Sequence, residues 1–313
     1  MSRYLLRHEA ILAVLLVLAL VVLAMQSDRF FTVDNLLNQG RLMAEVGLVA
    51  LAMTFVIVSA GIDLSVGSIL GLVAILLGVF WQKLGLPLPL AMVLGVVVGA
   101  LAGLVNGIII TRFRVPPLIA TLATLALYRG LAEGISQARS VRGYPEWFFV
   151  LGQGEVLGVP TQLWIFLACA MIAAIVLGMS TFGRATYVTG ANAVAARFSG
   201  IPVDRTILLI YTASGLISGL AAIIFVSRVS TTRSDMGTGL ELDVITAVVL
   251  GGTSIFGGRG TIIGTLLGLV LMQALKNGLA LAGVKGDGTI VVIGLILIAT
   301  IIISNLVRRD IDG

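Results

Sequence analysis

The most restrictive feature of this chain is a series of apolar runs, each about 16–24 residues long, the length a helix needs to cross a hydrocarbon layer of about 30 Å. Strands of a membrane barrel would be about half as long and would alternate polar with apolar residues. Charged residues make up only 11% of the chain, whereas soluble domains average about 25%. We therefore expect an all-α membrane protein, a polytopic bundle of about ten transmembrane helices in one domain over residues 1–313. The expected spans are 9–25, 42–60, 66–80, 88–111, 117–137, 161–180, 206–227, 241–252, 260–282 and 288–306.

The orientation follows from the first run and from the positions of the basic residues. The run after "MSRYLLRH" lacks a small-residue cleavage site, so we interpret it as a retained span with its N-terminus inside. An even number of spans returns the C-terminus to the same side. The Arg112 and Arg114 pair and the Arg308 and Arg309 pair, each beside a span end, favour the cytoplasm for both.

Composition and missing motifs exclude several classes of function. The net charge is +5, but the arginines are scattered through short loops, so a nucleic-acid partner is not expected. The single Cys169 excludes a disulfide framework and a cysteine metal site, and the lone His8 is read as an interfacial residue. The chain contains no G-x-x-x-x-G-K-[ST], H-E-x-x-H or G-x-S-x-G motif. We expect no catalytic residue, no metal and no cofactor in this chain.

Residues 182–206, "FGRATYVTGANAVAARFSGIPVDRT", form the more informative of two long connections. Asn192 can cap a helix, the alanines after it favour helix, and Gly200 with Pro202 ends it. The predicted helix runs from Ala193 to Ser199. Because so short a helix is marginal alone in water, it must pack on its own bundle or on another protein. The residues alone leave both open.

The stretch "SAGIDLSVGS" places Asp63 between two apolar runs, where a charge is costly and marks a functional hypothesis. Glycines on both sides predict a break in the helix, tolerated where protein or a water-filled cavity satisfies the backbone. Two interpretations remain open. Asp63 caps the next helix by accepting N–H groups near Ser65 and Val66, or it lies in a solute pathway.

A second glycine-rich stretch, "GGTSIFGGRG", predicts another break, because Gly251, Gly252, Gly257 and Gly258 permit close approach or positive φ. One break in each half is typical of transporters with internal repeats. Elsewhere, Arg129 and Glu133 lie four residues apart and are expected to neutralise each other. The aromatic residues 147–149 suit the level of the lipid headgroups, or a cap over the bundle.

Three of these stretches resemble one family. "GANAVAARFSGIPV" resembles the coupling loop of ATP-binding cassette importer permeases, in the branch that carries ribose, other monosaccharides and autoinducer-2. "GIDLSVGSILGL" and "AVVLGGTSIFGGRGTIIGT" look like two further signatures of that branch, in the expected order. "TRSDMGTGLELDVITAVVLGG" is similar to the second permease subunit of autoinducer-2 or rhamnose importers.

The resemblance implies the importer permease fold in a bacterial inner membrane, carrying a monosaccharide or sugar-like solute. The implied partners are a second permease subunit (a copy or a paralogue), cytoplasmic ATPase subunits that bind the ATP, and a periplasmic sugar-binding protein. It also implies that the 182–206 loop couples to the ATPase. The residues expected in that coupling are Gly190, Asn192, Ala193, Ala196, Arg197, Gly200, Ile201 and Pro202.

Polar residues inside the spans are candidates for the pathway, although such side chains also bond neighbouring helices. The candidates are Asp63, Ser65, Asn106, Thr121 and Thr124, with Thr54 and Asn277 in addition. Two alternative functions remain: a related permease for branched-chain amino acids, and an ion-coupled secondary transporter that uses a buried Asp63.

Overall fold

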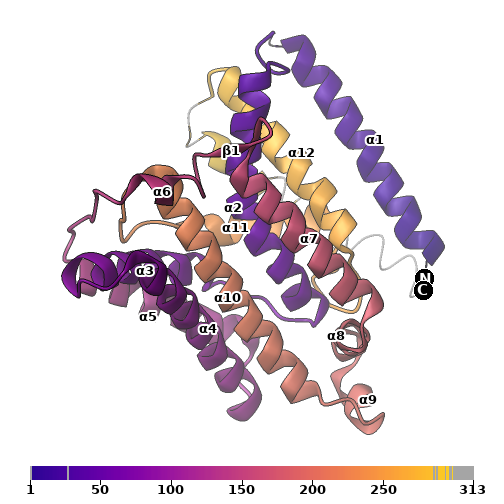
Figure 1. The fold of residues 1–313 in the computed structure, drawn as a ribbon. Coiled ribbons are helices and arrows are strands. Elements are labelled where there is room, and N and C mark those ends of the chain that lie inside the picture. The colour runs from indigo at the N-terminus through magenta and orange to yellow at the C-terminus, as the bar shows by residue number, and fades with distance from the viewer. Residues whose placement is uncertain are drawn as a thin grey trace.

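The computed structural model describes residues 2–26 and 28–284, together with 286, 288–292, 294, 295 and 298. The secondary structure of its described part is helical apart from one small hairpin, so the expected all-α membrane fold is confirmed (Figure 1). The helices are α1 (Ser2–Gln26), α2 (Val33–Val58), α3 (Val66–Gly78) with the π-helical turn η1 (Val79–Lys83), α4 (Leu88–Arg112), α5 (Pro117–Ser136), α6 (Glu146–Phe149), α7 (Thr161–Met179), α8 (Thr181–Ala191), α9 (Ala193–Phe198), α10 (Val203–Val229), α11 (Leu240–Leu250) and α12 (Ile262–Leu281). The hairpin pairs β1 (Glu155–Val156) with β2 (Val159–Pro160).

Seven helical segments of the described chain are long and apolar enough to cross a membrane: α2, α3 with η1, α4, α5, α7, α10 and α12. The span expected over 241–252 is not one full-length helix, because α11 has 11 residues and rises only about 16 Å. Residues 230–239, directly before α11, are not helical. The run expected over 288–306 lies largely outside the described residues.

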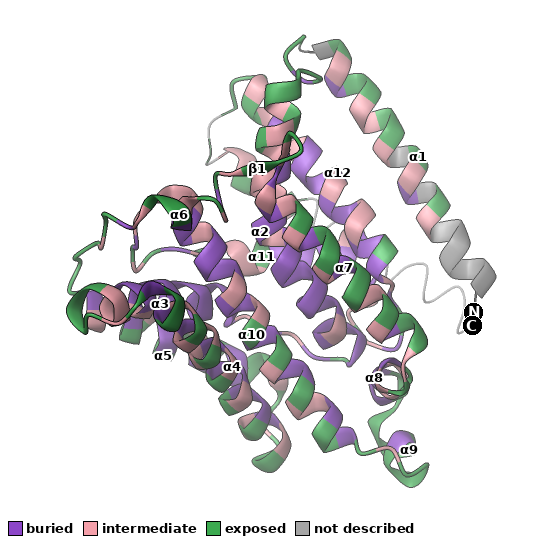
Figure 2. Cartoon of the chain, in the orientation of Figure 1, coloured by how far each residue is buried: buried purple, intermediate pink, exposed green. Residues whose placement is uncertain are grey.

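Helices α2 and α10 form the centre of the bundle, and Figure 2 shows the second half of α2 as almost wholly buried. Close packing of α10 on α4 depends on glycine, since a Cβ at Gly103 would lie 2.1 Å from the Tyr211 carbonyl oxygen and one at Gly215 would lie 2.1 Å from the Gly99 oxygen. Small residues thus let two long helices touch along their backbones.

An ion pair joins α2 to α10 inside this centre. Glu45 is 5% exposed and accepts two bonds from the Arg228 guanidinium, at 2.6 Å from Nε and 3.0 Å from Nη2. Two-point contact of this kind fixes the relative position of the two helices.

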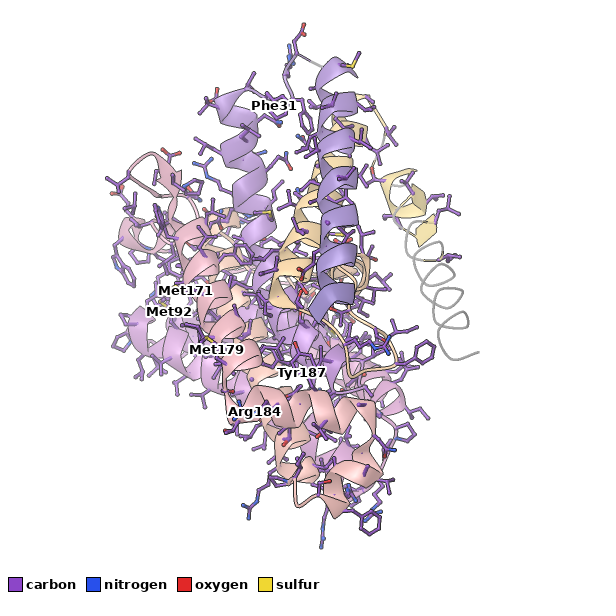
Figure 3. All side chains as sticks on the ribbon, turned by 90° about the vertical axis from the view of Figure 1, so that its right-hand side faces the viewer. Phe31, Met92, Met171, Met179, Arg184 and Tyr187 are labelled. Carbon is purple, nitrogen blue, oxygen red and sulfur yellow. The ribbon has the colours of Figure 1, made fainter. Side chains whose placement is uncertain are left out.

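The two ends of the bundle differ. The connection between α7 and α10 folds into α8 and α9, and we call this side the α9 end. The hairpin precedes α7 and lies at the other end of that helix, which we call the hairpin end (Figure 1). Met171 and Met179 project from α7 as exposed side chains, as expected of a lipid-facing surface (Figure 3).

The aromatic residues at the hairpin end do not share one environment. Trp147 is 49% exposed, but Phe148 is fully buried against Tyr144, with ring centroids 5.0 Å apart. Of the two alternatives for residues 147–149, the burial of Phe148 fits a cap over the bundle. Burial raises the pKa of Tyr144 in this loop.

Candidate coupling and pathway site

Helix α9 begins where the sequence predicts. Asn192 has extended backbone geometry, and its side-chain oxygen accepts the N–H groups of Val194 at 3.0 Å and Ala195 at 2.9 Å. These bonds satisfy two of the free donors at a helix start. The helix covers Ala193–Phe198, so it ends one residue earlier than expected, with Ser199 as its C-cap.

The end of α9 is also closed by local bonds. Gly200 has φ +79° and donates its N–H to the Arg197 oxygen, while Ile201 donates to the Ala196 oxygen, both at 3.0 Å. This pair of bonds with a left-handed glycine is a Schellman motif. Pro202 then begins the turn into α10. A six-residue helix is thereby held at both ends.

The exposed surface of α9 differs from the expected one. Residues 191–200 are all exposed except Ala196, which is fully buried. The structure places the Ala196 methyl inside the chain's own packing, so the expectation that it packs against a partner is wrong. Sequence reasoning missed Phe198, which is 90% exposed, and Val194, which is 64% exposed. Arg197 forms an ion pair with Asp204 at the start of α10.

The end of α8 touches both predicted helix breaks. The Gly258 N–H donates to the Val58 oxygen at 2.8 Å, which joins the glycine-rich stretch to the last residue of α2. A Cβ at Gly190 would lie 1.8 Å from that same oxygen and 2.8 Å from the Gly258 nitrogen. One at Gly257 would lie 2.7 Å from the Ala60 methyl. Three segments far apart in sequence therefore meet through backbone atoms.

The glycine-rich stretch is a true interruption between α11 and α12. Gly252, Gly257 and Gly258 have φ of +86°, +82° and +72°, a region that favours glycine. Gly251 packs so closely that its Cβ would lie 2.4 Å from the Gly264 oxygen. The four glycines predicted to allow the break are used for positive φ or close approach.

Tyr187 of α8, labelled in Figure 3, contacts the same junction. Tyr187 donates its hydroxyl to the Gly260 oxygen at 2.7 Å, and Thr261 donates to a Glu9 carboxylate oxygen at 2.5 Å. Burial, with the Glu9 charge, raises the pKa of the Tyr187 phenol, so the hydroxyl keeps the proton that it donates. The start of α1 therefore lies at the α9 end.

Asp63 lies in the first break and is fully buried. One carboxylate oxygen accepts the Ser65 N–H at 3.0 Å and the Ser65 hydroxyl at 2.6 Å, and the other accepts the Ser214 hydroxyl of α10 at 2.8 Å. Asn106 of α4 donates to the Ser65 hydroxyl oxygen at 2.8 Å. Of the two N–H groups expected as partners, Asp63 meets that of Ser65, directly before α3. The carboxylate thus joins the break to α10, and Ser65 joins it to α4.

The other polar candidates also bond within the chain. Thr121 donates to Ile62 at 3.1 Å and Thr124 to the Thr121 oxygen at 3.3 Å. Thr54 meets Thr265 at 2.8 Å. In the same way, the Asn277 oxygen accepts from Gln39 at 2.9 Å. The contacts of Thr54 and Asn277 tie α2 to α12 and that of Thr121 ties α5 to the first break, whereas the Thr124 bond stays within α5.

Four of the eight predicted coupling residues line a cavity of about 510 Å³ at the α9 end. Its walls come from the end of α2, the α4–α5 turn, α8, α9 and the start of α10. They include Ser59, Ala60, Arg114, Gly190, Asn192, Ala193 and Arg197. The structure therefore brings the first break and the predicted coupling loop to one opening.

Arg129 and Glu133, both in the described chain, form no direct ion pair, although the Glu133 charge acts on Arg129. Arg129 donates instead to the carbonyl oxygens of Met236 at 2.9 Å and Gly67 at 3.4 Å, and to that of Ser234. These acceptors lie far away in sequence, and a spacing rule for one helix does not include them.

Comparison with known proteins agrees with this arrangement. The model of the family described as "Branched-chain amino acid transport system / permease component" matches residues 35–301. The autoinducer 2 import system permease protein LsrD of Escherichia coli (strain K12) is 39% identical over 300 residues, which cover 94% of this chain and 91% of the relative. LsrD of Shigella flexneri and of Escherichia coli O157:H7 give the same figures. No solved structure matches the chain.

The resemblance to ATP-binding cassette importer permeases is thereby confirmed. The family match covers both helix breaks and the capped loop between α8 and α10, and the fold is a multi-pass helical bundle. The chain is therefore a membrane-spanning transporter subunit that belongs to the family described as "Branched-chain amino acid transport system / permease component".

Proposed function

We propose that this chain is the permease subunit of an ATP-driven importer for a sugar-like solute of the autoinducer-2 type. The names of its relatives favour that solute class over branched-chain amino acids, which the family description mentions. The bonds of Asp63 favour it over ion coupling, because both carboxylate oxygens already accept hydroxyl groups of this chain. Ser65 and Ser214 together occupy three of the roughly four acceptor positions of this carboxylate, which leaves little capacity to coordinate a carried ion.

The observation that carries the proposal is the contact of α8 with both helix breaks. A push on the α8–α9 loop reaches α2 and the α11–α12 connection through backbone contacts at Gly190, without a flexible side chain between them. We infer that a cytoplasmic ATPase docks on α9, and that its ATP-driven movement shifts the two breaks. The chain itself binds no ATP in this scheme.

The complete transporter then contains a second permease subunit, ATPase subunits with their ATP, and a periplasmic sugar-binding protein, in a bacterial inner membrane. The α9 end faces the cytoplasm. Glu9 lies at that end through its bond with Thr261, which supports a cytoplasmic N-terminus; the C-terminus is proposed to lie on the same side.

Phe198→Asp tests the docking. Phe198 is 90% exposed, and removal of an aromatic anchor from an interface typically costs about 2 kcal/mol, or about 30-fold in affinity. We expect insertion in the membrane to be unchanged, while co-purification of the ATPase and uptake of autoinducer-2 by ATP-loaded vesicles both fall.

The matched control is Leu157→Asp, at an equally exposed apolar residue of the hairpin end, which should retain the ATPase. Wild-type ATPase binding and uptake by Phe198→Asp would show that α9 is not the docking element. Uptake of leucine in place of autoinducer-2 by the wild-type complex would overturn the solute class.

A further inference from the structure

The connection between α10 and α11, residues 230–239, is not helical, yet it runs alongside α3. Near its start, Thr232 donates to the Val141 oxygen at 3.0 Å, and its hydroxyl oxygen lies 3.3 Å from where a Gly78 Cβ would be. Near its other end, a Cβ at Gly67 would lie 2.2 Å from the Gly237 oxygen. The 230–239 segment therefore runs antiparallel to α3 from Gly78 to Gly67, about 16 Å along that helix.

Two helices place the far end of this segment well inside the bundle. Gly67 lies four residues after Asp63, which accepts a hydrogen bond from Ser214 of α10. Ser214 lies about 16 Å along α10 from its start and about 22 Å from its end, so this contact is near the middle of the helix. Asp243, in α11 just beyond the segment, forms an ion pair with Lys276 of α12 at 2.6 Å. Lys276 lies about 21 Å along α12 from its start and about 8 Å from its end. The segment thus descends from the hairpin end into the membrane interior.

Irregular backbone at this depth is stable only where its polar groups find partners. Arg129 supplies them, because its guanidinium donates to the Met236 oxygen at 2.9 Å and to the Ser234 oxygen. A Cβ at Gly71 would lie 2.8 Å from both the Arg129 nitrogen and the Met236 oxygen, so glycine there makes room for the contact. One side of the segment is therefore fixed against α3 and α5.

The other side of the segment carries exposed polar groups. Arg233 and Asp235 form a two-point ion pair, with side chains 63% and 60% exposed, and Nε lies 3.0 Å from Oδ1. Thr238 is exposed as well. Charged side chains in the membrane interior are costly against lipid and face a water-filled cavity or other protein. A non-helical stretch that lines a cavity meets the same condition.

We propose that the 230–239 segment lines the solute pathway of the assembled transporter, and that Arg233, Asp235 and Thr238 bind a neutral, polyhydroxylated solute. The ion pair has no net charge, and it offers N–H donors beside carboxylate acceptors, which matches the two hydrogen-bonding roles of a hydroxyl group. This inference rests on the proposed import function, because it names the surface on which that solute is bound.

Cysteine labelling tests the placement, since Cys169 is the chain's single cysteine and Cys169→Ala gives a clean background. In this background we compare Thr238→Cys with Arg142→Cys in the exposed loop of the hairpin end and Met171→Cys on the apolar surface of α7. The probe is a membrane-impermeant, cationic methanethiosulfonate, applied to the complete complex in membranes. It reacts with the thiolate, which forms in water and not in lipid.

We expect Thr238→Cys to react within about tenfold of the rate of Arg142→Cys, and Met171→Cys at least about tenfold more slowly than either. Excess autoinducer-2 should slow the labelling of Thr238→Cys alone, and the label should stop uptake. Labelling of Thr238→Cys as slow as that of Met171→Cys would overturn the placement. Fast labelling that leaves uptake unchanged would overturn the binding role.

Substitution of the ion pair tests the chemistry. Asp235→Asn and Arg233→Gln each leave one charge unpaired, whereas the double variant restores neutrality with amide donors and acceptors. We expect each single variant to raise the KM for autoinducer-2 about tenfold and the double variant to regain part of the loss. A wild-type KM for autoinducer-2 in all three variants would overturn the binding role. If the wild-type complex imports no autoinducer-2, the proposed solute fails, while the labelling rates still decide whether the segment lies in an aqueous path.

Discussion

Gly190→Ala should uncouple the α9 end from the helix breaks. The added methyl would lie 1.8 Å from the Val58 oxygen, about 1.6 Å closer than the distance at which ordinary contact begins, and 2.8 Å from the Gly258 nitrogen. The obstacles are backbone atoms and cannot rotate away, so α8 must move off α2.

The magnitude follows from three effects. Overpacking costs about 1–3 kcal/mol. Loss of the Gly258–Val58 hydrogen bond, 2.8 Å long in the native chain, adds about 1 kcal/mol. Alanine in place of glycine within a helix returns about 1 kcal/mol. The steric effect is therefore larger, and a net destabilisation of about 2 kcal/mol is expected, or about 4 °C in the midpoint of thermal unfolding.

The assay is the thermal midpoint of the purified complex in detergent, measured beside uptake in vesicles. The matched control is Gly178→Ala on α7, where a Cβ meets nothing within 4 Å and no loss is expected. A Gly190→Ala complex with the midpoint and uptake of the Gly178→Ala complex would refute the reasoning, because it would show that the contact of α8 with Val58 is not tight.

Two further predictions concern buried charges. Asp63→Asn should keep folding and uptake, because the amide oxygen still accepts from Ser65 and the amide nitrogen can donate to Ser214. Asp63→Leu should lose assembly of the complex. Normal assembly of the Leu variant without uptake would assign the carboxylate to the pathway instead. Arg228→Met should reduce the yield of folded protein through a loss of about 3–5 kcal/mol, because it leaves the Glu45 carboxylate without its partner. Adding Glu45→Gln should recover much of that yield. An Arg228→Met variant with the yield and thermal midpoint of the wild type would show that the pair is dispensable.

The sequence predicted best those features, such as helix ends, that depend on residues close together in the chain. The bounds of α9 follow from Asn192, Gly200 and Pro202, because a cap acts on N–H and C=O groups two to four residues away. The inward position of Ala196 could not be predicted in the same way. Which side of a short helix turns inward depends on packing against α8 and α10, for which the loop has no local signal.

The partner of Arg129 shows the same division on a larger scale. The spacing to Glu133 was correct for a helix pair, but the carbonyl oxygens of a distant segment took the guanidinium. A trace of this outcome is present in the sequence as Gly67 and Gly71, one turn apart on α3. Small residues at that spacing indicate close backbone approach, without saying which segment approaches.

The separation of tasks along α9 has a consequence for how such loops diverge. Its fold depends on the cap at Asn192, the buried methyl of Ala196 and the left-handed Gly200, while Val194 and Phe198 contribute mostly exposed surface. Mutations at the two exposed positions can therefore alter which partner is recognised without unfolding the helix. Over generations, a duplicated transporter could acquire its own matching motor subunit by drift at the surface of one six-residue helix, with its scaffold unchanged.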